Sequence, residues 1–286
     1  MCSGIGEPGQ LSQHGIAPKV DLQGVGANLH DHLQVRTVFR LKPDTGHKSL
    51  NEMSNSLIGR VKMGVEYALN QSGPMSMGPS QMGLFAKSSP ELGTPDLQYH
   101  LQPLSLDQFG EPLHSFPGFT ASVCNLRPTS RGELSLASGD IRDAPLINPN
   151  FLATQNDKEI AAKSIRHSRM LANSPAFRDL VESEYLPGAD VVSDAELIEA
   201  AGRISTTIFH PVGTCKMGPG SDPTAVVDAR LRVHGVDGLR VVDASIMPQI
   251  VSGNTSSPTV MIAEKAAEFI IRGRQKEEDA ALAAAM

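Results

Sequence analysis

Several short segments in the first half of the chain alternate apolar and other residues with a period of two. In residues 35–41 one side carries Val, Thr, Phe and Leu, and the other side carries two arginines. Residues 96–102 alternate in the same way, and residues 119–125 and 133–137 are further segments of strand length. A period of two indicates a β-strand with one face against a core. The middle of the chain is therefore predicted to form a mostly antiparallel sheet.

Helical periodicity appears later in the chain. Residues 157–172 repeat small and apolar side chains at helical spacing, and Asn156 or Asp157 is suited to cap that helix. A last helix is predicted to begin near Pro258, because the fixed φ of proline suits a first turn. Strands and helices together predict a mixed fold, α+β or α/β, with helices flanking the sheet.

Composition limits the possible partners. The chain has 286 residues, 40% of them hydrophobic, and a net charge of -6 with no basic run, so nucleic acid is not an expected partner. Three widely spaced cysteines without a Cys-x-x-Cys pair give no metal site and favour a reducing, cytoplasmic location. No apolar run reaches the roughly 18 residues of a membrane-spanning helix.

The segment from Gly4 to Gly9 matches the pattern G-x-G-x-x-G of dinucleotide-binding loops. That fingerprint requires a preceding strand and a following helix whose first amides meet a pyrophosphate. Only three residues precede Gly4, so we do not expect a dinucleotide site here.

Two later segments carry candidate chemistry. His210 precedes Pro211, which restricts the backbone of His210 to extended or turning conformations, and imidazole can accept a proton near neutral pH. Asp243 is predicted to stand at the end of a strand, and Asn254 and Thr255 just before a helix N-terminus, where amides favour negative charge. Taken alone, each segment also fits a purely structural role: a histidine beside a turn, and a strand followed by a capped helix.

Seen together, these segments resemble the closing part of the glucose-methanol-choline oxidoreductases, in particular choline dehydrogenase-like and alcohol dehydrogenase-like members. Further matches in the family's order extend the resemblance over nearly the whole chain. The matching runs are Ser3–Gly6, Gly24–Leu33, Leu126–Gly132, Ile147–Leu152, Phe209–Gly218, Leu239–Ser245 and Gly253–Ala267.

The resemblance implies an FAD-dependent oxidation of an alcohol to an aldehyde or ketone, with hydride passing to flavin N5. By that resemblance His210 accepts the proton of the substrate hydroxyl, and Asn254 holds the oxygen. Asp243 and Ala244 correspond to residues that touch the ribityl-pyrophosphate part of FAD, and Asn254 and Thr255 to residues at its pyrimidine edge. The small-molecule alcohol itself is not identified by the sequence.

The resemblance also implies a domain arrangement. Residues 1–34 are predicted to be a remnant of the FAD-binding domain, residues 35–204 the substrate-binding domain, residues 205–275 a return to the FAD domain, and residues 276–286 a tail. Family members are longer, and their amino-terminal part holds the ADP moiety of FAD. The alternative prediction is therefore an inactive remnant that cannot hold FAD alone.

Overall fold

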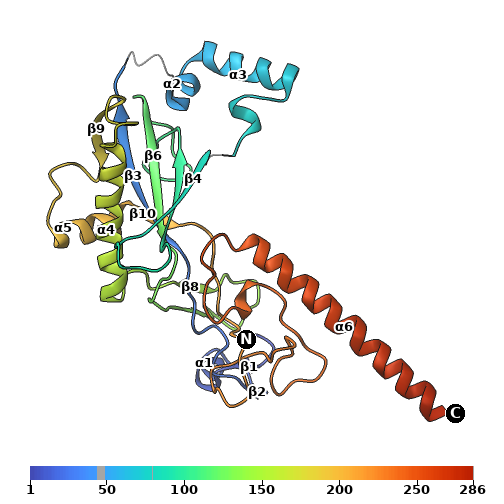
Figure 1. Cartoon of the computed structure of the whole chain (residues 1–286). Coiled ribbons are helices and arrows are strands. Elements are labelled where there is room, and N and C mark those ends of the chain that lie inside the picture. Colours follow the sequence, from blue (N-terminus) through green and yellow to red (C-terminus); the bar gives the residue numbers. More distant parts are fainter. Residues whose placement is uncertain (44–48, 79, 286) are drawn as a thin grey trace. The chain divides into compact units, whose positions relative to one another are not determined.

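The computed structural model describes residues 1–43, 49–78 and 80–285, with side chains up to residue 273 (Figure 1). The chain divides into two compact units. The first unit contains Met1–Asp31, Arg127–Ala153 and Phe209–Met286, and the second contains His32–Leu126 and Thr154–Ile208. Residues 127–153, included in the predicted substrate domain, thus group with the first unit.

The second unit is built on a six-stranded sheet in which every pair of strands is antiparallel. The strands follow the order β10-β3-β6-β5-β4, and β9 pairs with β3 beyond the end of β10. Their bounds are β3 (Leu33–Leu41), β4 (Met82–Ala86), β5 (Leu97–Gln102), β6 (Gly118–Asn125), β9 (Val181–Leu186) and β10 (Ser205–Thr207). The strands predicted from alternation at 35–41, 96–102 and 119–125 are confirmed as β3, β5 and β6.

Helices α4 (Gln155–Ala172) and α5 (Asp194–Ile204) flank this sheet (Figure 1). The predicted cap of α4 is wrong: its N-cap is Thr154, whose side chain accepts the N–H of Asp157. Several neighbouring side chains can cap, and the point at which the backbone turns from extended to helical selects among them. Three helical segments, α2 (Leu50–Asn55), α3 (Leu57–Asn70) and η1 (Pro74–Ser76), lie between β3 and β4 in the chain.

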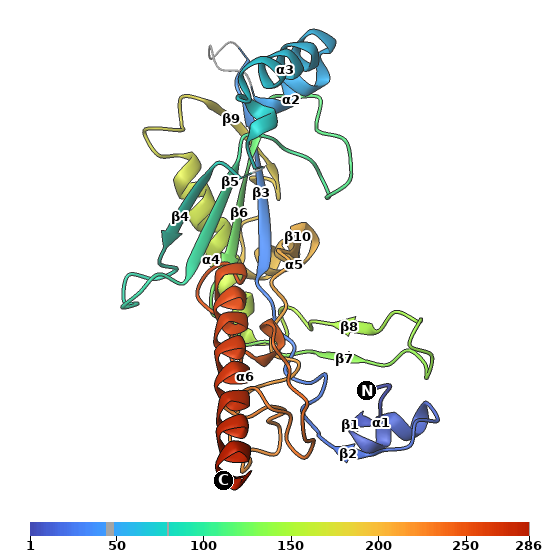
Figure 2. The same ribbon diagram turned by 90° about the vertical axis from the view of Figure 1, so that its right-hand side faces the viewer.

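The first unit has little regular structure besides its long final helix (Figure 2). It contains a parallel pair and an antiparallel ribbon of very short strands, and two further short helices. These elements are β1 (Ile5–Gly6) with β2 (Val20–Asp21), β7 (Glu133–Ser135) with β8 (Leu146–Asn148), α1 (Pro8–Gln13) and η2 (Ala244–Ile246). Helix α6 (Ser256–Ala285) begins two residues before Pro258 and continues to Ala285, within the predicted tail.

The core of the first unit comes from widely separated segments. Val212, Val227, Ile246 and Ile262 belong to one buried apolar cluster. The strand predicted to end at Asp243 is not formed: residues 226–242 make only isolated bridges, and their apolar side chains pack on irregular backbone.

In the G-x-G-x-x-G segment, backbone amides are hydrogen-bonded to a side chain of the same segment. Glu7 caps α1, and its carboxylate accepts the N–H groups of Gly9 and Gln10. The amides that would meet a phosphate in a dinucleotide loop are therefore bonded to a side chain of the same segment.

Candidate active site

His210 is held from its backbone. Its N–H donates to Oδ1 of Asp31 at 2.9 Å, and the residue is 9% exposed. Phe209 before it adopts a positive φ of 63°, which is uncommon for a residue with a side chain. Pro211 follows, so the residues on both sides of His210 restrict its backbone. The direction in which the imidazole leaves the backbone is therefore fixed.

His210 and Asn254 lie side by side, although 44 residues separate them. Nδ2 of Asn254 is 3.4 Å from Nε2 of His210. With the amide nitrogen as donor, Nε2 is the acceptor and the ring proton is on Nδ1. Burial lowers the pKa of His210, and the negative charge of Asp31 opposes this by raising it. The imidazole is therefore neutral at pH 7 and able to take up a proton.

A second histidine, absent from the sequence-based prediction, holds the surrounding loops together. His30 is 1% exposed; its Nδ1 donates to the carbonyl of Asn28 at 2.6 Å, and its Nε2 accepts the N–H of Ile250 at 2.9 Å. Its backbone also exchanges hydrogen bonds with Val212. His30 thus joins the segment after His210 to the segment before Asn254.

This arrangement fixes the charge of His30. Burial, the larger effect, lowers its pKa to about 4; the positive charge of Arg131 also lowers it, and the hydrogen bond to Asn28 raises it. A neutral ring with its proton on Nδ1 is the form that satisfies both bonds. The sequence signal for this linking role of His30 was weak: a histidine inside the turn-forming loop from Asn28 to His32.

Close backbone contact behind His210 requires glycine. Gly213 has a φ of +97°, and a Cβ there would lie 2.4 Å from the carbonyl oxygen of Asn28 and 2.7 Å from Cε1 of His30. Asn28 also donates from its side chain to the carbonyl of Gly213 at 3.3 Å. Two loops far apart in the chain thereby pack backbone to backbone.

The predicted cofactor residues occupy two turns. Asp243 is not at the end of a strand; its carboxylate accepts the N–H of Ser245 at 2.8 Å and caps η2. Ala244 is the first residue of η2 and packs, half-buried, against the apolar cluster. Thr255 is buried at the residue before α6, and its carbonyl accepts both the N–H and the hydroxyl of Thr259.

The loop before α6 leaves room for a ligand. A Cβ at Gly253 would meet no atom within 4 Å, and Ser256 begins the helix three residues later. The first N–H groups of a helix have no partner within the helix and favour negatively polarised atoms. An open approach to such donors beside an imidazole and a carboxamide fits the carbonyl-rich edge of a flavin.

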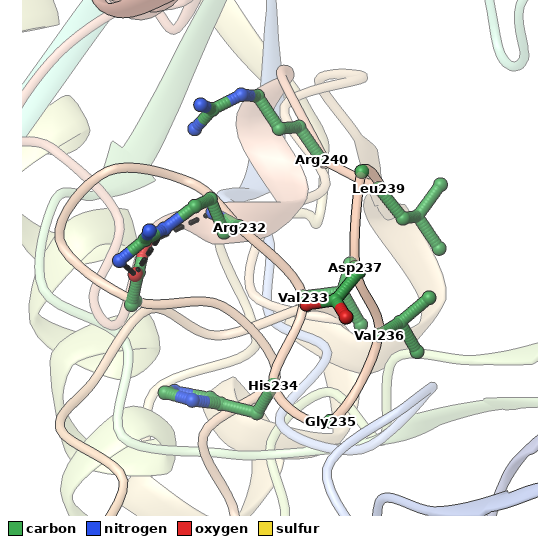
Figure 3. Close-up of a pocket in the computed structure, with 10 residues that line it drawn as sticks. Arg232, Val233, His234, Gly235, Val236, Asp237, Leu239 and Arg240 are labelled. Atoms are coloured by element: carbon green, nitrogen blue, oxygen red, sulfur yellow. Dashed lines mark hydrogen bonds and ion pairs between the residues drawn. The ribbon is translucent and has the colours of Figure 1, made fainter. Parts of the chain in front are cut away.

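A separate pocket of about 450 Å³ lies in the first unit at the turn from Val233 to Arg240 (Figure 3). Figure 3 shows the side chains of Arg232 and His234 on one side of this turn and those of Val236 and Leu239 on the other. Arg232 is paired with Asp228. None of the predicted catalytic or cofactor residues lines this pocket, so it is distinct from the His210 site.

Two further properties are found within the described ranges. No group of three or more His, Cys, Asp and Glu side chains there could hold a metal ion. No helix there combines the length and the apolar character needed to cross a bilayer.

Comparison with known proteins gives consistent matches. Residues 128–263 match the family model described as GMC oxidoreductase. The alcohol dehydrogenase [acceptor] of Pseudomonas putida is 40% identical over 95% of this chain and 48% of its own length. The mitochondrial choline dehydrogenase of Mus musculus is 39% identical over 98% of this chain and 46% of its own length. The chain therefore spans about half the length of the curated relatives it matches.

Solved structures agree with this relationship. A formate oxidase from Aspergillus oryzae superimposes with a TM-score of 0.85 at 31% identity, covering 96% of this chain and 52% of the other. Pyridoxine 4-oxidase from Mesorbium loti superimposes with a TM-score of 0.77 at 27% identity, over 93% of this chain and 47% of the other. The chain belongs to the GMC oxidoreductase family and corresponds to the carboxyl-terminal half of its relatives.

Proposed function

We propose that this chain is the catalytic carboxyl-terminal part of an FAD-dependent enzyme that oxidises an alcohol to an aldehyde or ketone. The observation that carries the proposal is the 3.4 Å contact between Nε2 of His210 and Nδ2 of Asn254. A buried, neutral imidazole and a carboxamide that point at one position can act together on a single hydroxyl group.

The two side chains have separate roles in this proposal. Nε2 of His210 accepts the hydroxyl proton of the substrate, and Nδ2 of Asn254 donates a hydrogen bond to the oxygen on which negative charge develops. Removal of the proton makes the carbinol C–H bond a better hydride donor, so the pair lowers the barrier by positioning and by electrostatic stabilisation. Asp31 supports the step by holding the backbone of His210 and by favouring the protonated ring.

The residues of the chain that would hold FAD lie in the two turns described above. Asn254, Thr255 and the first amides of α6 would contact the pyrimidine edge, and Asp243 and Ala244 would contact the ribityl-pyrophosphate part. When bound, FAD supplies the acceptor for the hydride, that is, for the two electrons lost by the alcohol. The side chain of Asp243 keeps η2 in shape through Ser245.

The substrate class follows from the relatives. The matched relatives include an alcohol dehydrogenase [acceptor] and choline dehydrogenases, and choline is itself a primary alcohol. We extend this to a small-molecule alcohol for the present chain, with a second polypeptide segment supplying the contacts to the ADP moiety. A cytoplasmic location, expected from the odd number of cysteines, is part of the same proposal.

Reconstitution tests the proposal. The chain is produced together with the amino-terminal half of a GMC oxidoreductase, and flavin absorbance and alcohol-dependent reduction of a dye are measured. The expected result is a yellow complex that reduces the dye only when alcohol is present. A complex that holds flavin but reduces no dye with any primary or secondary alcohol would contradict the proposal, and would favour an inactive remnant.

A further inference from the structure

Helix α3 of the second unit carries large apolar side chains on its exposed side. Residues three and four apart along a helix share one face, and five apolar residues of α3 follow this spacing. Their side chains are 51–82% exposed, and a contiguous exposed apolar patch marks an interaction site. This set, called here the α3 stripe, consists of Leu57, Ile58, Val61, Val65 and Leu69.

The opposite side of α3 is packed. Gly59 lies against α2, because a Cβ added there would be 2.2 Å from the carbonyl oxygen of Met53, and Met63 one turn later is 8% exposed. Helix α2 is anchored in turn: the buried side chain of Asn51 donates to Oγ of Ser105 at 2.9 Å and accepts the N–H of Ser105 at 2.9 Å. Figures 1 and 2 show α3 beyond one end of the sheet, away from α4 and α5. The packing of α3 on α2 thus directs the α3 stripe outward.

Basic side chains border the α3 stripe on both edges. With 3.6 residues per turn, Lys62 lies beside one edge and Arg60 beside the other, and both are exposed. The one acidic residue of the helix, Glu66, lies against the turn that follows α3, since a Cβ added at Gly73 would be 2.6 Å from its carboxyl carbon. Long basic side chains can lay their methylene groups along an apolar surface and extend their charge beyond it. The charge next to the α3 stripe is therefore suited to a negatively charged surface.

We propose that α3 binds the surface of a lipid bilayer that contains anionic lipids. The α3 stripe enters the boundary between headgroups and acyl chains, with the helix axis parallel to the surface. Lys62 and Arg60 reach lipid phosphate groups from its two edges. Binding of this kind uses one face of one helix, so it needs no helix that crosses the bilayer.

The size of the α3 stripe argues against a second copy of the chain as its occupant. Helix α3 has 14 residues, which corresponds to a length of about 21 Å, and a helix is about 10 Å wide. Each partner in a standard protein interface buries roughly 800 Å². One helix face of this size supplies only part of such an interface, whereas a bilayer takes up a single apolar helix face.

This inference is independent of the proposed function. His210 and the residues assigned to FAD belong to the first unit, and α3 belongs to the second. In the proposed function, the additional polypeptide segment contacts the ADP moiety of FAD, so it is expected against the first unit. Binding to lipid can therefore be measured on the full chain without flavin or turnover.

Co-sedimentation with lipid vesicles tests the proposal. The full chain is mixed with vesicles of phosphatidylcholine alone, or of phosphatidylcholine and phosphatidylglycerol in equal parts, and the bound fraction is measured against lipid concentration. Saturable binding to the mixed vesicles, at least about tenfold tighter than to phosphatidylcholine, is expected, because each basic side chain near an anionic surface contributes about fivefold. Lys62→Gln should weaken binding to the mixed vesicles about fivefold and leave binding to phosphatidylcholine unchanged.

A matched pair of exposed isoleucines tests the apolar contribution. Ile58 in the α3 stripe is 82% exposed, and Ile141 in the loop between β7 and β8 is 80% exposed. Ile58→Asp should weaken binding to the mixed vesicles at least tenfold, and Ile141→Asp should bind as the unaltered chain does. Both replaced side chains are exposed, so both variants should fold, which circular dichroism checks. If Ile58→Asp does not fold, the two vesicle compositions and Lys62→Gln still decide.

Four results would overturn the proposal. They are no binding to the mixed vesicles, equal effects of Ile58→Asp and Ile141→Asp, a dimer in size-exclusion chromatography that Ile58→Asp dissociates, and loss of binding when the chain is in complex with the amino-terminal half of a GMC oxidoreductase. The third result would identify a second copy as the occupant of the α3 stripe, and the fourth would identify the amino-terminal half. A chain that binds vesicles while the reconstituted complex oxidises no alcohol contradicts only the proposed function.

Discussion

Nε2 of His30 accepts the backbone N–H of Ile250 at 2.9 Å, although the two residues are 220 positions apart in the chain. The bond requires a neutral imidazole, because a protonated ring has no lone pair to accept with. Ile250 lies four residues before Asn254, and His30 also exchanges backbone hydrogen bonds with Val212, two residues after His210. His30, which is not one of the two proposed catalytic residues, thus links the loop that follows His210 to the loop that precedes Asn254.

The pH dependence of stability follows from His30. Its pKa in the folded protein is about 4, below the ordinary value of 6.5, so folding stabilises the neutral form. The contribution is present in full above pH 6.5 and is lost as the pH falls from 6.5 toward 4. A shift of this size corresponds to about 3 kcal/mol. Urea unfolding at pH 4 to 7 should show this decline, and the His30→Gln variant should show a flatter curve and lower stability at pH 7. Parallel curves for the two proteins would refute the assignment.

Gly213 should not tolerate a side chain. Its φ is +97°, and a Cβ added there would lie 2.4 Å from the backbone oxygen of Asn28, which leaves no space. Gly213→Ala is expected to lower the free energy of unfolding by more than about 3 kcal/mol. Gly202→Ala is the control: a Cβ there meets no atom within 4 Å, and the residue lies inside α5. That change should raise stability by about 0.5–1 kcal/mol in the same denaturation experiment. Equal effects of the two substitutions would contradict the packing described for Gly213.

Asp31 should tune the acidity of His210. Its negative charge raises the pKa of His210 against the larger lowering by burial. Asp31→Asn keeps an oxygen that can accept the N–H of His210 but removes the charge, so the pKa of His210 should fall further. Histidine NMR titration, with the His210 signal assigned from its absence in His210→Ala, measures this. Asp222→Asn, a charge removal at an acid paired with Lys216, should leave that pKa unchanged. An unchanged or higher pKa in Asp31→Asn would show that the charge of Asp31 does not act on the ring.

The tyrosine beneath the sheet should contribute modestly to stability. The hydroxyl of Tyr99 is fully buried among the side chains of α4, and burial raises its pKa above the usual range. Tyr99→Phe keeps the ring and removes the hydrogen bonds, which should lower the free energy of unfolding by about 1 kcal/mol. A loss above about 3 kcal/mol, measured by urea unfolding, would mean that the ring packing itself had changed.

The sheet could be predicted from the sequence because the alternation in β3, β5 and β6 reports directly on burial of one face. What alternation could not reveal is that the opposite face is covered as well. The local pattern predicts that Arg36 faces solvent, and a distant loop carrying Phe109 buries it.

In the candidate site, too, some residues were predicted from the sequence and others were not. His210 and Asn254 were predicted through resemblance of two motifs, and the structure brings their side chains into contact. His30 was missed because its role depends on a bond to Ile250 across 220 residues, which local pattern cannot encode. Asp243 was predicted at a strand end from an apolar run, but that run packs as irregular backbone in which the carboxylate caps a turn.

The most direct test of the account is the turnover of His210→Ala in the reconstituted complex, with flavin content measured in the same sample. If His210 accepts the hydroxyl proton, kcat with a primary alcohol should fall by a factor of about 100 or more while bound flavin is retained. His14→Ala, which changes a histidine remote from the pair in sequence, should keep the kcat of the unaltered complex. A kcat for His210→Ala equal to that of His14→Ala would contradict the assignment of His210 as the proton acceptor.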